Sequence, residues 1–145
     1  MCYMAFLSTD CADDLSQRTS DRVRFERPSA ETDTPCPPHL KSLHNWFLGS
    51  KAGCSCTFRH LSRESVELGF GAREDWYPEE EDELVATREL YETLRDLVQR
   101  GHHVELLDCW SGEEGDAPIP LEVSVSEVPV DHFRLFEGYL FTLKP

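Results

Sequence analysis

The segment Gly53-Cys54-Ser55-Cys56-Thr57-Phe58-Arg59-His60 concentrates thiol and imidazole groups in a stretch that otherwise has the pattern of a core strand. Successive side chains of a strand point to opposite faces. One face would therefore carry the soft and apolar members, which are Cys54, Cys56, Phe58 and His60. The polar members Ser55, Thr57 and Arg59 would share the other face, so the alternation predicts a half-buried strand over 54–61. The glycines at 49 and 53 predict a hairpin that joins this strand to residues 46–48.

The two cysteines of this segment suggest a metal site. Residues two apart on a strand are separated by roughly 6.6 Å, and two thiolates on one zinc ion approach to about 3.8 Å, so leaning side chains would let Cys54 and Cys56 chelate. Cys109, at the end of another predicted strand, is the best candidate to join them, with His60 or Cys2 as the fourth ligand. Soft thiolates select zinc, iron or copper(I) over magnesium. The simpler alternative is that Cys54 and Cys56 are small buried hydrophobic residues.

Composition narrows the classes of partner and compartment. The chain of 145 residues has the length of one domain, and its 14 basic and 28 acidic residues give a formal charge of −14. This charge argues against binding to nucleic acid or to an anionic membrane and favours cations or a basic protein partner. No apolar run reaches the roughly 20 residues of a membrane-spanning helix, and no basic segment precedes the first apolar run. We therefore expect a cytoplasmic protein with reduced cysteines; the six are Cys2, Cys11, Cys36, Cys54, Cys56 and Cys109.

Hydrophobic periodicity predicts an α+β domain over 1–145. Pro78 and a run of acidic residues are followed by apolar residues at helical spacing, and this pattern predicts one long helix over 78–100. Alternating or continuous apolar runs predict strands over 2–8, 21–27, 65–71, 102–110, 121–125 and 139–143. Two short helices are expected, over 11–18 and 129–136, with a Pro-rich loop at about 28–40. The expected fold is a single mixed, mainly antiparallel sheet with the long helix packed on one face.

Two further functions remain open beside metal binding, and we lean against catalysis. In a thiol enzyme, Cys54, Cys56 or Cys109 would act as the nucleophile with His60 or His103 as the base. In an acidic interaction module, the run Glu79 to Glu83 would bind a basic partner without any thiol. Weaker signals are Cys36 with His39, at a Cys-x-x-His spacing, and Cys11 near a predicted helix start.

Four segments of the chain together resemble a family of small bacterial proteins of uncharacterised function. They are Cys2-Tyr3 with Leu7-Ser8-Thr9-Asp10, residues 53–61, Trp76-Tyr77-Pro78-Glu79, and Asp108-Cys109-Trp110-Ser111-Gly112. The resemblance spans most of the chain and implies a bacterial cytoplasmic protein. It implies no activity, cofactor or site residue.

Overall fold

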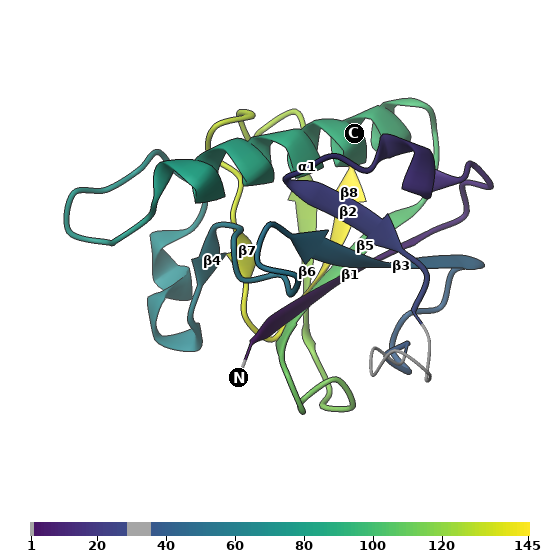
Figure 1. The fold of residues 1–145 in the computed structure, drawn as a ribbon, viewed down its shortest axis with the longest axis horizontal. Helices are drawn as coiled ribbons and strands as arrows, with labels where there is room; N and C mark the ends of the chain where they lie inside the picture. Colours follow the sequence, from purple (N-terminus) through teal and green to yellow (C-terminus); the bar gives the residue numbers. More distant parts are fainter. Residues whose placement is uncertain (1, 29–35) are drawn as a thin grey trace.

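The computed structural model describes residues 2–28 and 36–145 and has an α+β fold (Figure 1). Six strands form one mixed, mainly antiparallel sheet in the order β2-β3-β1-β5-β8-β6. Their bounds are β1 Tyr3–Thr9, β2 Val23–Glu26, β3 His44–Ser50, β5 Val104–Trp110, β6 Ile119–Ser124 and β8 Tyr139–Lys144. Strand β1 pairs antiparallel with both β3 and β5, whereas β6 pairs parallel with β8. Two short parallel strands, β4 His60–Leu61 and β7 Leu135–Phe136, lie apart from this sheet.

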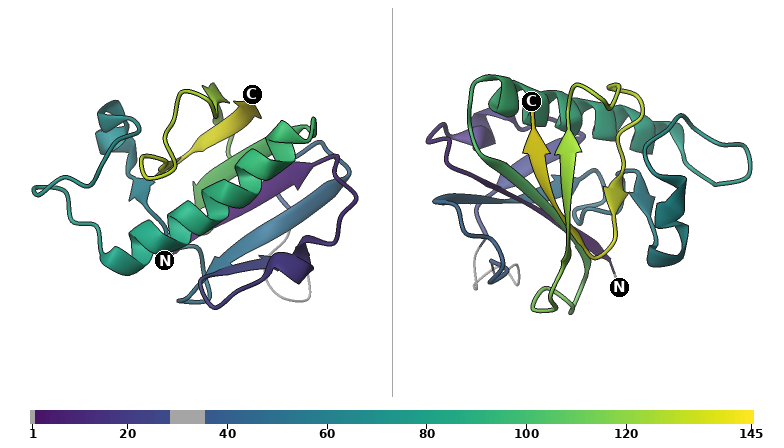
Figure 2. Two further views of the ribbon diagram at one scale, coloured as in Figure 1. Left: turned by 90° about the horizontal axis from the view of Figure 1, so that it is seen from above. Right: turned by 180° about the vertical axis from the view of Figure 1, so that it is seen from behind.

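The long helix α1, Glu81–Gln99, lies across one face of the sheet (Figure 2). Its first turn is acidic, which complements the positive end of the helix dipole, and the Glu80 N–H donates to the Glu83 carboxylate at 3.4 Å. Gly101 ends the helix with a φ of +88°, a conformation that glycine adopts without strain. The helix begins at residue 81 rather than at the predicted 78, and none of the helices among the described residues is long and apolar enough to span a membrane.

The sheet is buried on both faces, although unequally. The main core lies between the sheet and α1 and includes Ala5 and Leu7 of β1, while a smaller cluster on the opposite face includes Met4 and Phe6. The predicted first strand is thus confirmed as β1, which is buried on both faces. The alternation matters for the site, because residues of β5 also divide between the two faces.

Several predicted elements are wrong in kind. Residues 54–59 form turns, because Ser50 N–H bonds to the Cys54 carbonyl and Gly53 N–H bonds to the Ser50 carbonyl in place of a hairpin ladder with β3. The short strand that remains, β4, pairs with β7 instead.

The predicted strand over 65–71 is also wrong, since Arg63–Leu68 forms a 3₁₀ helix that ends at Gly69 with a φ of +65°. Neither predicted short helix has the expected form. Cys11 lies before a single 3₁₀ turn at Leu15–Arg18, and the segment before β7 consists of turns. The predicted Pro-rich loop falls partly on residues 29–35, which lie outside the described residues.

Candidate metal centre

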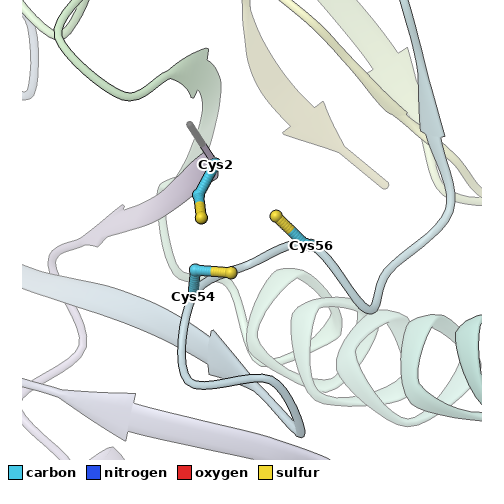
Figure 3. Close-up of side chains that lie close together, drawn as sticks. All are labelled: Cys2, Cys54 and Cys56. Carbon is cyan, nitrogen blue, oxygen red and sulfur yellow. The ribbon is translucent and has the colours of Figure 1, made fainter.

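Three cysteine side chains converge at the start of β1. The Sγ atoms of Cys2, Cys54 and Cys56 all lie within 4.8 Å of one another, and each residue is partly exposed. Figure 3 shows Cys2 just before β1 and the other two on the turn that follows β3, with the three sulfur atoms pointing toward a common centre. We call these three residues the thiol cluster.

Ser55, buried between the two turn cysteines, fixes their position. Its N–H donates to the Tyr3 carbonyl at 3.1 Å, and its hydroxyl donates to the Leu48 carbonyl at 2.6 Å. The same hydroxyl accepts the Ala5 N–H at 2.8 Å. Ser55 thus joins β1 to β3 through three hydrogen bonds, and its neighbours Cys54 and Cys56 lie close to Cys2 (Figure 3). The predicted faces are reversed here, because Ser55 is fully buried whereas Cys54 and Cys56 are partly exposed, and the segment is a turn rather than a strand.

His60 lies beneath the thiol cluster and supports it indirectly. Its Nε2 is 2.6 Å from the Ser55 carbonyl oxygen and its Nδ1 is 2.7 Å from Oδ2 of Asp108, both within a buried environment. The ring also stacks on Tyr3, with centroids 3.9 Å apart. Both ring nitrogens are therefore occupied by protein acceptors, which leaves neither directed at a thiol as a metal ligand or as a base.

The charge state of this pair follows from its partners. A carbonyl oxygen can only accept, so Nε2 carries a proton. Burial alone would lower the pKa of His60, but the Asp108 carboxylate and the Ser55 carbonyl outweigh burial and raise that pKa. Burial also raises the pKa of Asp108, although the charge and the hydrogen bond of His60 oppose that rise. The raised pKa of His60 favours an imidazolium beside a carboxylate, and Oδ1 of Asp108 is buried without a hydrogen-bond partner among the described residues.

Cys109 does not join the thiol cluster. In the register of β1 with β5 it lies opposite Met4, on the face of the sheet turned away from α1, and it packs in the smaller core cluster. Its thiol donates to the Met4 carbonyl at 3.4 Å, and burial raises its pKa to about 12. Cys2, expected from the sequence only as an alternative fourth ligand, takes the place predicted for Cys109.

The three thiols differ in their electrostatic surroundings. Partial burial would raise the pKa of Cys54, but interactions with the thiol and N–H of Cys56 prevail and lower it. Burial and the neighbouring Cys54 raise the pKa of Cys56 to about 12, even though the Tyr3 N–H donates to its Sγ at 3.3 Å. Of the two turn cysteines, Cys54 therefore loses its proton more readily, and keeping all the sulfurs of the cluster as thiolates needs a compensating positive charge.

The other sequence candidates lie elsewhere. His103 is at the far end of β5 from Asp108, with its Nε2 3.4 Å from Glu105. Cys36 is exposed, while His39 Nε2 lies 3.1 Å from the Gly115 carbonyl. Cys11 is buried.

The acidic run 79–83 is not one surface, because Glu79 is buried in an ion-pair cluster. Its carboxylate accepts from Arg59 Nε at 2.7 Å, from Arg59 Nη2 at 2.9 Å and from Arg134 Nη2 at 3.0 Å. The two arginines also donate to backbone carbonyls of Gly69, Gly71 and Ala72. The two arginines thus link Glu79, at the end of the 69–79 segment, to backbone carbonyls near its start. No pattern in the sequence predicts this cluster.

Comparisons with protein-family models, with curated proteins and with solved structures gave no match. The resemblance to a family of small bacterial proteins therefore stays a prediction, and the chemistry of the site has to be argued from its own residues.

Proposed function

We propose that this protein binds a thiophilic metal ion through Cys2, Cys54 and Cys56, and that zinc is the first ion to test. The observation that supports the proposal most directly is the approach of three Sγ atoms to within 4.8 Å of one another. Zinc–sulfur bonds of about 2.3 Å place the sulfurs of one zinc ion about 3.8 Å apart. Small side-chain rotations would close that difference.

The surroundings of the thiol cluster support a cation. Three thiolates bring three negative charges into a partly buried site, and a divalent ion leaves one of them uncompensated. The formal charge of −14 adds a long-range attraction for cations.

Three protein ligands rather than four suggest an open coordination position. Structural zinc sites are usually closed by four protein ligands, whereas sites with three keep one position for water or for another molecule. The partial exposure of all three cysteines fits such an open site. This arrangement favours a metal that is exchanged or that contacts a further ligand over one that only holds the fold together.

The decisive experiment compares two cysteine substitutions. Metal content would be measured by elemental mass spectrometry on untagged protein purified without chelator, and cobalt(II) substitution would report thiolate ligation through sulfur-to-metal charge-transfer absorption. We expect about one equivalent of metal in the wild type and in Cys109→Ser. Second-sphere changes weaken metal sites by about 10–100-fold, so loss of the ligand in Cys2→Ser should weaken binding by more than about 100-fold.

The same comparison can refute the proposal. Equal metal content in Cys2→Ser and the wild type would show that the cluster is not the site. Loss of metal in Cys109→Ser with retention in Cys2→Ser would favour the ligand set predicted from the sequence. A wild-type protein that is purified without metal and binds neither added zinc nor added iron(II) or copper(I) would overturn metal binding altogether.

A further inference from the structure

We propose that the thiol cluster is also a site of reversible oxidation, in which a low-molecular-mass disulfide converts Cys2 and one of the two turn cysteines into an intramolecular disulfide. The inference stands on the convergence of sulfur atoms from two chain segments that are far apart in sequence (Figure 3). It does not require that the cluster binds a metal.

The geometry needs side-chain movement but little backbone movement. A disulfide requires an S–S distance of about 2.05 Å, and the cluster sulfurs start within 4.8 Å of one another. Ser55 holds the turn to β1 through its N–H bond to Tyr3 and its hydroxyl bond to Ala5. Closure of a disulfide requires the cysteine side chains to rotate toward one another while Ser55 holds the backbone of the turn against β1. Partial exposure of all three thiols gives a small oxidant access to them.

Chain connectivity favours a bond between the two segments. A disulfide between Cys54 and Cys56 would close a small ring through a single intervening residue and would strain the geometry that disulfides prefer. A bond from Cys2 to either turn cysteine closes a loop of about 50 residues, and such a cross-link restricts the unfolded chain more strongly. The cross-segment bond also fastens the start of β1 to the turn after β3.

The reaction balances with a disulfide RSSR as the oxidant. One cluster thiolate attacks a sulfur of RSSR, which forms a mixed disulfide and releases RS⁻. A second cluster thiolate then attacks the protein sulfur of that mixed disulfide, which forms the intramolecular bond and releases a second RS⁻. Two protein thiols lose two electrons and two protons, and RSSR becomes two RSH. The third cysteine of the cluster remains a thiol.

If the proposed function holds, oxidation and metal binding exclude each other. A disulfide to Cys2 removes two of the three thiolate ligands, so the oxidised protein cannot hold the ion with the same set of ligands. This consequence rests on the proposed metal site, whereas the oxidation itself is tested on metal-free protein. The two proposals can therefore fail separately.

The test uses full-length, reduced, metal-free protein in which the exposed Cys36 is replaced by Ser. After exposure to glutathione disulfide, free thiols are blocked in denaturant and the protein is digested with trypsin. Cleavage after Arg18, Lys51 and Arg59 places Cys2 in peptide 1–18 and both turn cysteines in peptide 52–59. We expect these two peptides to be cross-linked, with fragment ions placing the bond at Cys2 rather than at the buried Cys11.

A matched variant with the additional change Cys2→Ser provides the control. Without the resolving thiol, glutathione should remain attached to peptide 52–59 as a persistent mixed disulfide. Three outcomes would overturn the inference. The first is a disulfide confined to peptide 52–59, and the second is a bond to Cys11. The third is a cluster whose three thiols stay reduced at a glutathione disulfide concentration that oxidises a small-molecule dithiol. Circular dichroism before and after oxidation would verify that the cross-link forms in the folded protein.

Discussion

Replacing Glu79 by Gln should destabilise this protein more than any conservative change on its surface. The Glu79 carboxylate accepts three hydrogen bonds from Arg59 and Arg134, and the side chains of all three residues are at most 2% exposed. Gln preserves the shape of the side chain but removes its negative charge. Two guanidinium groups would then remain buried without a counter-ion.

The expected magnitude follows from that burial. Removing one partner of a buried ion pair costs about 3–5 kcal/mol, because the remaining charge stays desolvated. Gln fills nearly the same volume as Glu, so no cavity term is added. For a chain of this length, each 1 kcal/mol lowers Tm by roughly 2–4 °C, which gives an expected decrease of about 6–20 °C.

Urea unfolding, followed by circular dichroism, would measure the loss. The matched control is Glu81→Gln, since the Glu81 side chain is 78% exposed and lies 3.6 Å from Arg73. An exposed pair of this kind contributes at most about 1 kcal/mol. If Glu79→Gln lowers the free energy of unfolding no more than Glu81→Gln does, the argument from the buried charge cluster is refuted.

The pH dependence gives a second check on the same residue. Burial would raise the pKa of Glu79, but Arg59 and Arg134 prevail and hold it below its ordinary value of 4.5. A group whose pKa is depressed on folding stabilises the protein above its unfolded pKa. That contribution is lost as the pH falls below about 4.5 through the folded value. The wild type should lose this part of its stability on acidification, whereas Glu79→Gln should lack this portion of the pH dependence.

Two residues beneath the thiol cluster give further predictions. Ser55→Ala leaves the Leu48 carbonyl and the Ala5 N–H unpaired in the core, which should cost about 1–3 kcal/mol for each group in chemical denaturation. A Ser55→Ala protein as stable as the wild type would contradict this. His60→Gln removes the partner of buried Asp108 and should destabilise by about 3–5 kcal/mol. Because the pKa of His60 is raised on folding, its stabilisation is present below its ordinary pKa of 6.5 and declines as the pH rises through the folded value, and this decline should disappear in His60→Gln. An unchanged pH profile would contradict the imidazolium assignment.

Local pattern in the sequence was sufficient for the elements that are periodic and long. The apolar stripe and the acidic start identify α1, and the continuous apolar run identifies β1. Short segments fared worse, because a few residues with alternating polarity fit a turn or a 3₁₀ helix as well as a strand. Residues 54–59 are an example, since local bonds around Ser50 and Gly53 replace the expected ladder.

The composition of the thiol cluster depended on strand order, which the sequence does not contain. The sequence by itself determined that Cys54 and Cys56 lie close together, because only one residue separates them along the chain. Only the tertiary structure decided that β1 lies between β3 and β5, and this order brings Cys2 to the turn cysteines.

The same order turns Cys109 to the opposite face of the sheet. Which strand neighbours which, and which face meets the helix, are set by burial of apolar surface summed over the whole chain. The buried contacts between Arg59, Glu79 and Arg134 depend on that packing in the same way, so no local pattern in the sequence predicts them.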